Sequence, residues 1–373
     1  MGLRIERLHC RDFRSYDDFG LADIGSLTVI VGPNAVGKTN LLEGLQLLTS
    51  LSSFRNPSTE HLVREGAESC SFAIDVRGDG RQLSLEFHVK HDAREYYLNG
   101  KKKRPRDLRG LLPSVMFSPD DLQLAKGSQS VRRAQADHLG SQLSANYQTV
   151  RKDYEKVLRQ KNRCLKEGGS EPYLQSLNDV LATVGAQLYR LRYGMLSALA
   201  PYLKDSYARI SGGNEEVSLA YVPSWLRDGI DFSRIPEVPD FSRSEARRSL
   251  LAALERDSFK ERERRACTQG PQLDAVEFYL DGRCARSFAS QGQQRSLVLA
   301  LKIAEVELIR ERLGQAPVLL LDDVMSELDG ARREALLSLM SGEIQTFITA
   351  TNAEALGDLS LLGGRIVRIG EGT

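Results

Sequence analysis

An eight-residue segment near the amino end carries residues that could hold a polyphosphate. Residues 32–39 match the pattern G-x-x-x-x-G-K-[ST] at every fixed position. In such a loop, backbone amides and the amino end of the following helix surround phosphate oxygens. Lys38 would reach the β and γ phosphates, and the Thr39 hydroxyl would bind Mg²⁺. The predicted phosphate site comprises Gly32, Pro33, Asn34, Ala35, Val36, Gly37, Lys38, Thr39 and Asn40.

A pair of acidic residues far downstream could complete this site. The apolar run Val318–Leu321 is followed directly by Asp322 and Asp323. Such a run predicts a buried central strand, and open α/β sheets bind ligands at the carboxyl edge of their strands. Asp322 would hold Mg²⁺ directly or through water, and Asp323 would act as a base that polarises an attacking water. Taken alone, the acids would mark only a strand-to-turn transition, but the upstream loop favours a metal-dependent site.

The sequence around the glycine-rich segment predicts the elements that hold it. Residues 27–31 form an apolar run typical of a buried strand, and residues 40–48 have apolar side chains at helical spacing. Further on, residues 71–76 and 83–89 alternate in hydrophobicity as strands do. The first 125 residues therefore predict mixed strands and helices around the loop.

A hairpin and a basic run are predicted next. Residues 95–98 precede Asn99-Gly100, a pair typical of a tight hairpin because both central positions of its turn need a positive φ. Residues 101–106 then read Lys-Lys-Lys-Arg-Pro-Arg. Such a run is most often a solvated turn, and a contact to a nucleic-acid phosphate backbone is the alternative.

The middle of the chain is predicted to form two antiparallel helices. Apolar side chains recur at helical spacing from Tyr147 to Leu165, and Gly168-Gly169 ends this helix. Ser170 and Pro172 start the next one, and the short connection predicts a helical hairpin. The second helix has the 3-4 alternation of a coiled-coil seam at Leu174, Leu177, Leu181, Val184, Leu188, Leu191 and Met195.

The first of these helices also has a surplus of basic side chains. They could form a ridge that faces DNA, or only a solvated outer face. The basic residues are Arg151, Lys152, Lys156, Arg159, Lys161, Arg163 and Lys166. After it, residues 210–242 show no clear period, and a charged helix is predicted from Arg243 to about Arg265. A strand pattern returns at residues 276–280, before the turn pair Asp281-Gly282.

The composition limits the class of protein. The chain has 373 residues, enough for two lobes, and a net charge of +1, so any nucleic-acid contact must come from local patches. Its five cysteines are scattered without a C-x-x-C pair, which favours a reducing compartment over a zinc site. No apolar run approaches the length of a membrane span, and the first residues lack the core of a signal peptide. We therefore expect a cytosolic (cytoplasmic) protein with no membrane partner.

Three short segments resemble ABC-type ATPases. Residues 288–295, before a helix predicted over 297–312, are similar to the signature motif with its core Ser-x-Gly-Gln. Residues 326–329 look like the D-loop, and residues 347–351 look like the strand that precedes the switch histidine of transporters, which is absent here. The resemblance implies an α/β fold with an ABC-type P-loop ATPase head and a mixed sheet. The head would comprise residues 1–125 and 268–373, and an inserted helical lobe with a short antiparallel coiled coil would comprise residues 126–267.

Further motifs resemble the RecF family of bacterial recombination-mediator ATPases. About 250 residues separate Lys38 from Ser290, more than in transporter domains and less than in ATPases with long coiled coils. The matching segments are Asp12-Phe13-Arg14-Ser15-Tyr16, Asn40-Leu41-Leu42-Glu43, Ser53-Phe54-Arg55, residues 117–122, Lys126-Gly127-Ser128, Arg132-Arg133, residues 159–163 and residues 289–293.

This resemblance implies a DNA-repair ATPase that forms a homodimer on binding ATP. The phosphate loop of one copy would hold ATP and Mg²⁺, and Ser290 and Gly292 of the other would cap the γ-phosphate in trans. Gln293 and Asp329 would belong to the same nucleotide site, and Lys38, Asp323 and Ser290 would be catalytic. The family also implies slow hydrolysis, binding to gapped DNA or single-strand–duplex junctions, RecA loading with RecO and RecR, and links to replication and the SOS response.

The chain departs from the usual family sequence at three places. Ala35 replaces a glycine, residues 272–275 read Gln-Leu-Asp-Ala in place of His-Arg-Asp-Asp, and residues 134–137 replace an aromatic-Leu-Asp. Contacts to DNA or partners at the last two places are expected to differ here. The main alternative function is an ABC-transporter-like ATPase subunit. A small-molecule kinase or GTPase lacks support because no Asn-Lys-x-Asp motif is present. An interaction protein that only keeps the loop is another alternative, because Asp323 is shorter than the glutamate of many relatives.

Overall fold

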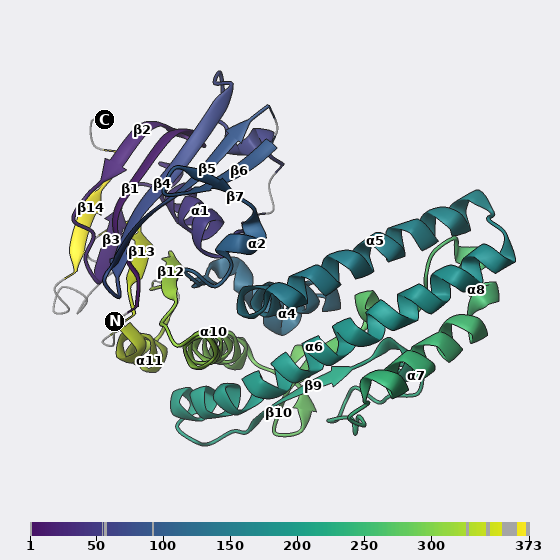
Figure 1. Cartoon of the computed structure of the whole chain (residues 1–373). Helices are drawn as coiled ribbons and strands as arrows, with labels where there is room; N and C mark the ends of the chain where they lie inside the picture. The colour runs from purple at the N-terminus through teal and green to yellow at the C-terminus, as the bar shows by residue number, and fades with distance from the viewer. Residues whose placement is uncertain are drawn as a thin grey trace. The chain divides into compact units, whose positions relative to one another are not determined.

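The computed structural model describes residues 2–53, 55, 58–91, 93–325, 328–340, 344–352 and 364–370 (Figure 1). The chain divides into two compact units, one of residues 1–121 and 305–373 and the other of residues 122–304. The expected boundary after residue 125 lies close to the first division. The second division differs from the expected one after residue 267, because residues 275–280 form a strand that pairs inside the second unit.

The first unit contains a six-stranded antiparallel sheet. Its order is β2-β1-β4-β5-β6-β7, with β1 at Arg4–Phe13, β2 at Tyr16–Leu21, β4 at Ser69–Gly78, β5 at Arg81–Lys90, β6 at Ala93–Leu98 and β7 at Lys101–Lys103. The strands predicted at 71–76 and 83–89 are confirmed as parts of β4 and β5. The predicted hairpin is also confirmed, with positive φ at Asn99 (51°) and Gly100 (70°).

A second sheet in this unit is entirely parallel. Its order is β14-β3-β13-β12-β8, with β14 at Arg365–Arg368, β3 at Leu27–Val31, β13 at Thr346–Ala350, β12 at Val318–Asp322 and β8 at Ser114–Phe117. All five residues of β3 are buried, as are the first four of β12. Both strands predicted from apolar runs are therefore confirmed.

Helix α1 (Lys38–Thr49) packs against strands of both sheets, β4 and β5 on one side and β8, β12 and β13 on the other. Buried on all sides, it has apolar residues around most of its circumference, as a core helix requires. Gly44 allows the close approach, since a Cβ there would meet the Phe72 ring at 2.1 Å. The other helices described in this unit are α2 (Pro105–Leu108), α11 (Gly330–Met340), the end of α10 (Gln291–Leu313) and the 3₁₀ turns at Glu60–Leu62 and Pro119–Leu122.

The second unit is mainly helical. Helices α5 (Ala145–Glu167) and α6 (Glu171–Ser211) form the predicted antiparallel hairpin, which Figure 1 shows in teal. Gly168 closes α5 in a left-handed conformation (φ 69°). Of the predicted seam residues, Val184 and Leu191 are only partly buried and the others are buried. The other helices are α3 (Gln123–Lys126), α4 (Gln129–Leu143), α7 (Arg243–Arg256), α8 (Ser258–Arg264), α9 (Ala285–Phe288) and α10 (Gln291–Leu313), which continues past residue 304.

Two features of this unit differ from expectation. The prediction of a single helix from Arg243 to about Arg265 is wrong. The helix breaks at Asp257, whose carboxylate accepts a hydrogen bond from Gln269 Nε2 at 2.6 Å. Strand β9 (Val217–Val222), in the region without a clear period, pairs with β10 (Ala275–Leu280). The β10 strand continues through the predicted Asp281-Gly282 turn into β11 (Arg283–Cys284). Short 3₁₀ turns lie at Ser224–Leu226 and Pro271–Leu273.

The five cysteines all lie within the described residues, and they are buried free thiols. Among the helices that the structure describes, none has the length and hydrophobicity needed to cross a membrane.

Candidate nucleotide site

Three parallel strands bring the phosphate loop and the acidic pair Asp322–Asp323 to one edge of their sheet. β13 lies between β3 and β12, and its Thr349 is in register with Ile30 on one side and Asp322 on the other. Because the strands run in the same direction, the loop that follows β3 and the acids that end β12 emerge at the same edge. The sequence prediction that these two distant segments form one site is supported by this register.

A hydroxyl–carboxylate cluster lies at this edge. Asp322 Oδ1 accepts one hydrogen bond from Thr39 Oγ1 at 2.9 Å and another from Thr349 Oγ1 at 2.7 Å. Thr349 is completely buried. Sequence reasoning did not include Thr349, although a hydroxyl between the apolar residues Ile348 and Ala350 of a buried strand was the available signal. The three oxygen-bearing side chains are the kind of ligand that Mg²⁺ prefers.

The phosphate loop is held from within by its lysine. Lys38 is buried, and its Nζ donates hydrogen bonds to the carbonyl oxygens of Gly32 (2.7 Å) and Pro33 (2.8 Å). Pro33, Asn34 and Ala35 form the exposed rim of the loop. Val36 points to the protein core, where it packs against the main cluster of buried side chains. Of the predicted loop residues, therefore, Val36 anchors the loop and the rim residues face outward.

Ala35 has a conformation that favours glycine. Its φ is 66°, in the left-handed region that is unfavourable for residues with a Cβ. Gly37 has a φ of 109°, and a Cβ there would meet Ser15 Oγ at 2.5 Å, so this second glycine is required both by backbone and by space. The departure at Ala35 thus leaves the loop shape intact but introduces local strain.

Replacing Ala35 by glycine should therefore stabilise the protein. We expect the free energy of unfolding to rise by about 1 kcal/mol. Glycine has no Cβ and so removes the cost of the left-handed conformation, and this gain exceeds the loss that comes from the greater entropy of glycine in the unfolded chain. Urea denaturation followed by circular dichroism measures the change. Ala252→Gly, at an exposed position of α7, is the control and should lower stability by about 1 kcal/mol. A loss of stability in A35G would contradict the left-handed assignment.

An ion pair between a partly buried arginine and a buried glutamate supports the start of α1. Glu43 is completely buried, and both of its carboxylate oxygens accept hydrogen bonds from the Arg14 guanidinium at 2.9 Å. Ser53 Oγ donates to the same carboxylate at 2.5 Å. Arg14 lies in the turn between β1 and β2, so this two-point contact fixes that turn against the helix. The segments that carried the family resemblance around Arg14, Glu43 and Ser53 therefore meet in space, whereas Phe54 lies outside the described residues.

Asn40 links the same turn to the following loop. Its Nδ2 donates to Ser15 Oγ at 3.0 Å, and its Oδ1 accepts from Arg55 Nη1 at 3.0 Å. Both polar atoms of the Asn40 side chain therefore hold protein groups. This arrangement assigns Asn40 a role in supporting the phosphate loop.

Asp323 lies directly beside the hydroxyl–carboxylate cluster. Its φ is 52°, and its backbone amide donates to Thr349 Oγ1 at 3.0 Å, which turns the chain sharply after β12. Burial raises the pKa of Asp323 above its ordinary value of 3.8, Asp322 raises it further, and Lys38 opposes the shift. A carboxylate with a raised pKa next to the phosphate loop is suited to accept a proton from water.

Only part of the predicted D-loop can be placed. Ser326 and Glu327 lie outside the described residues. Asp329 Oδ1 accepts a hydrogen bond from the Arg332 amide at 3.1 Å, and its carboxylate forms an ion pair with the Arg332 side chain. Asp329 thus caps the amino end of α11.

The signature-like segment forms a helix start in the second unit. The Ser290 amide donates to Gln293 Oε1 at 2.7 Å, and Ser290 Oγ accepts from the Gln293 amide at 3.2 Å. This reciprocal pair is a capping box at the start of α10, which begins earlier than the 297 expected from sequence. Ser290 is exposed and Gly292, two residues further on, is partly buried, so the helix start is open at the surface of its unit.

Comparison with known proteins places the chain in a family. The model of the RecF/RecN/SMC N terminal domain family matches residues 4–365. The DNA replication and repair protein RecF of Lactobacillus acidophilus is 34% identical, over 99% of this chain and 98% of its own length. The chain belongs to the RecF family.

Solved structures agree with membership of the RecF family. The recombination mediator protein RecF, in a structure with ATP described for the RecFOR pathway, has a TM-score of 0.85 at 30% identity and covers 94% of this chain and 92% of its own. An Smc head domain from Pyrococcus furiosus has a TM-score of 0.51 at 15% identity, over 95% of this chain and 92% of its own, and shows the fold alone. The predicted fold, an ABC-type ATPase head with an inserted helical lobe, is confirmed.

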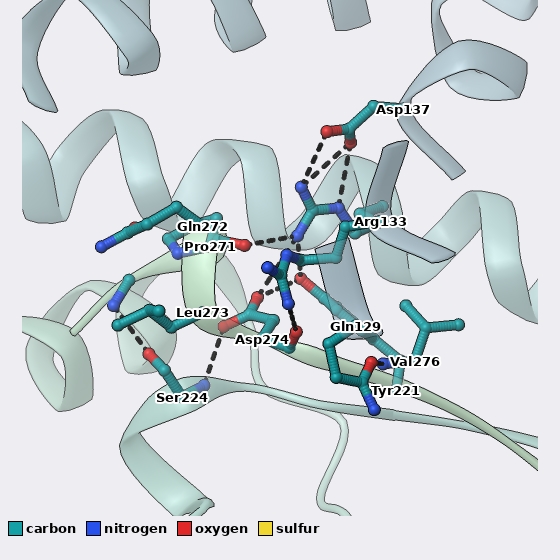
Figure 2. Close-up of polar contacts among 12 residues, drawn as sticks. Gln129, Arg133, Asp137, Tyr221, Ser224, Pro271, Gln272, Leu273, Asp274 and Val276 are labelled. Atoms are coloured by element: carbon teal, nitrogen blue, oxygen red, sulfur yellow. Dashed lines mark hydrogen bonds and ion pairs between the residues drawn. The ribbon is translucent and has the colours of Figure 1, made fainter. Parts of the chain in front are cut away.

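Two segments of the second unit depart from the usual RecF-family sequence, and each retains an aspartate that belongs to a buried polar network (Figure 2). Asp137 accepts hydrogen bonds from Arg192 Nη2 at 2.9 and 3.1 Å. Asp274, completely buried, accepts from the Ser224 amide at 2.7 Å and from the Tyr221 hydroxyl. These carboxylates connect α4, α6 and β9 from the inside, so the two aspartates that the chain shares with the usual sequence serve packing. Of the residues that depart from it, Ala134 is exposed, and Gln272 and Leu273 are partly buried.

Proposed function

We propose that this RecF-family chain is an ATP-dependent DNA-binding protein of recombinational repair and replication. The observation that carries the proposal is the meeting of the phosphate loop with the Thr39–Asp322–Thr349 cluster at one sheet edge. Such a loop and acidic strand end are the two halves of a nucleoside triphosphate site. The RecF relatives, named for DNA replication and repair and solved with ATP, support the choice of ATP and DNA. Membership of this family favours DNA repair over the transporter-type alternative.

The cluster fits a magnesium ion chemically. Thr39 and Asp322 would hold Mg²⁺ through a hydroxyl and a carboxylate oxygen, which are hard oxygen ligands. Mg²⁺ at such a site neutralises charge that develops on the β and γ phosphates. Lys38 would contribute a second positive charge on the same phosphates.

ATP is proposed to join two copies of the chain. Ser290 and the amino end of the 23-residue helix α10 offer an exposed site with a positive dipole end, which suits a phosphate. In the arrangement proposed, Ser290, Gly292 and Gln293 of one copy close over the γ-phosphate held by the other, and Asp329 lies at the same interface. ATP binding and dimerisation then favour each other by the same free energy, typically about 1–3 kcal/mol.

Hydrolysis is proposed to open this dimer. Asp323 would take the proton of the attacking water, and Lys38 and Ser290 would stabilise the charge on the phosphoryl oxygens. Because Ser290 would come from the other copy, the full set of catalytic groups exists only in the dimer. Turnover is therefore expected to be slow.

The biological setting follows from the family. We propose that the closed dimer binds gapped DNA or single-strand–duplex junctions and, with RecO and RecR, supports RecA loading and the SOS response. The description of the RecF relative as a recombination mediator in the RecFOR pathway supports these partners. The place of action would be the cytoplasm, where bacterial DNA lies.

Replacing Asp323 by asparagine tests the proposal. The variant should retain ATP and remain a dimer, with hydrolysis reduced roughly 100-fold or more, as expected when a general base is lost. Sedimentation of the variant with ATP, with ADP and with ATP plus gapped DNA measures dimerisation, and an ATPase assay measures the rate of hydrolysis. A variant that stays monomeric with ATP, or that hydrolyses ATP at the parental rate, would contradict it.

The same substitution should also stabilise the fold at neutral pH. The raised pKa of Asp323 means that its contribution to stability is fully present below pH 3.8 and is lost as the pH rises through the folded-state pKa. At pH 7 the ionised carboxylate is therefore a cost that asparagine removes. A thermal melt at pH 7 without nucleotide should show a higher midpoint for Asp323→Asn, and a lower midpoint would mean that the carboxylate is stabilised in the folded state.

A further inference from the structure

Five basic side chains of α5 lie in one line along the helix. Their spacing alternates between four and three residues, which keeps them within about 40° of a single line on a helix with 3.6 residues per turn. All five are exposed. We call this set, which consists of Lys152, Lys156, Arg159, Arg163 and Lys166, the α5 stripe.

The other two basic residues of α5 have different roles. Lys161 is buried and forms an ion pair with Glu261 at 2.6 Å. Arg151 donates from its Nε to Glu155 at 2.8 Å. Of the seven basic residues of α5 considered in the sequence analysis, two therefore form ion pairs within the unit, and the other five make up the α5 stripe.

The α5 stripe lies opposite the packed face of the helix. The buried residues of α5, among them Val150, Tyr154 and Lys161, follow a line half a turn away from it. That face is covered by α6 and α8, which both pack against α5 within the second unit, and Figure 1 shows α5 at the edge of this unit. The stripe is therefore open along its length of about 21 Å.

The charges of the stripe are largely uncompensated. Arg163 pairs with Glu167 at 2.8 Å, whereas the other four members make no ion pair with any side chain that the structure describes. Successive members are like charges three or four residues apart, an arrangement that destabilises a helix. A solvated helix face normally mixes charges of both signs, so a continuous positive line points to a negatively charged partner.

We propose that the α5 stripe binds the phosphate backbone of double-helical DNA, an inference that rests on the proposed DNA-binding function. Its members are about 5 Å apart along the helix, comparable with the spacing of phosphates on DNA. No apolar or aromatic side chain belongs to the line, so it offers no anchor for a folded protein and no stacking surface for unpaired bases. The contact would be independent of base sequence, because phosphates carry no sequence information.

A pair of matched double variants tests the stripe. Lys156→Gln/Arg159→Gln removes two central charges, and Arg248→Gln/Arg264→Gln removes two exposed charges from α7 and α8 as the control. Glutamine has a helix propensity close to that of lysine and arginine, so both variants should fold, which thermal melts verify. Binding to a fluorescent duplex is titrated from 0.05 to 0.3 M salt, with ATP present. The stripe variant should lose roughly tenfold or more in affinity, and its slope of log K against log salt should be shallower by about 1–2.

The outcomes separate the stripe from the function on which it rests. A parent protein that binds neither duplex nor gapped DNA under these conditions overturns the proposed function itself. If the parent binds DNA and the stripe variant keeps its affinity and slope, only the stripe is wrong. Poly-L-glutamate serves as a second probe. If the parent protein binds poly-L-glutamate more tightly than duplex DNA, and the stripe variant loses this affinity as well, the stripe binds an acidic protein and not DNA. That result would overturn the proposal.

Discussion

Replacing Lys38 by alanine should lower the affinity for ATP by roughly 100-fold or more and abolish ATP-dependent association of two copies. The Lys38 ammonium lies against the carbonyl oxygens of Gly32 and Pro33, at the mouth of the loop. Hydrogen bonds that involve a charged group are worth about 1.5–3 kcal/mol each, and the lysine would make more than one to the phosphates. Titration with a fluorescent ATP analogue measures the affinity, and sedimentation measures association.

The control for this experiment is Lys102→Ala, which removes an exposed lysine of β7 that pairs with Glu95. This control should bind ATP as the parent does, since it lies on a different sheet from the phosphate loop. If K38A and K102A bound the nucleotide equally well, the loop would not be the phosphate site. An unchanged ATP-dependent dimer in K38A would count against nucleotide-driven association.

Replacing Arg192 by methionine should lower the free energy of unfolding of the second unit by about 3–5 kcal/mol. Arg192 is 2% exposed, donates to both carboxylate oxygens of Asp137 and to the Pro271 carbonyl at 2.8 Å, and lies 3.7 Å from Asp274. Methionine fills much of the volume but leaves two buried carboxylates without their positive partner. The cost is therefore that of uncompensated buried charge.

Arg190→Met provides a matched control on the same helix. Arg190 is partly exposed and pairs with Asp240 and the Phe241 carbonyl, so its loss should cost less than about 1 kcal/mol. Denaturant unfolding of both variants, followed by helical circular dichroism, gives the difference. A stability loss in R192M no larger than in R190M would mean that the network around Asp137 and Asp274 contributes little.

The parts of the site that the sequence predicted are those determined locally. The loop of residues 32–39 needs only its own glycines and lysine, and the Asp322–Asp323 pair follows directly from an apolar strand. The hairpin at Asn99-Gly100 was predictable for the same reason, because two adjacent residues set the φ values of its turn. The capped helix start at Ser290 likewise depends on residues three positions apart.

Long-range contacts account for what the sequence did not predict. Thr349 belongs to the hydroxyl–carboxylate cluster only because β13 pairs between β3 and β12. The Arg14–Glu43 pair joins positions 29 residues apart, and the sequence around Glu43 does not show that its carboxylate is buried. The place of residues 275–280 in the second unit depends on β10 pairing with β9, a strand whose pattern is too irregular to detect. The α5 stripe became distinct only when the structure placed Lys161 in the interior.

Mixing two inactive variants tests the central claim, that one copy's phosphate loop is completed by Ser290 of another. Lys38→Ala has an impaired loop and an intact Ser290, and Ser290→Arg has the reverse, so each alone should hydrolyse almost no ATP. Because neither variant alone builds a complete site that holds two copies together, the ATP-dependent dimers in a 1:1 mixture pair the two variants. Each mixed dimer has one complete site of two, so up to roughly half of the parental rate should return. Hydrolysis in the mixture that stays at the level of the separate variants, with each variant folded by circular dichroism, would contradict the account.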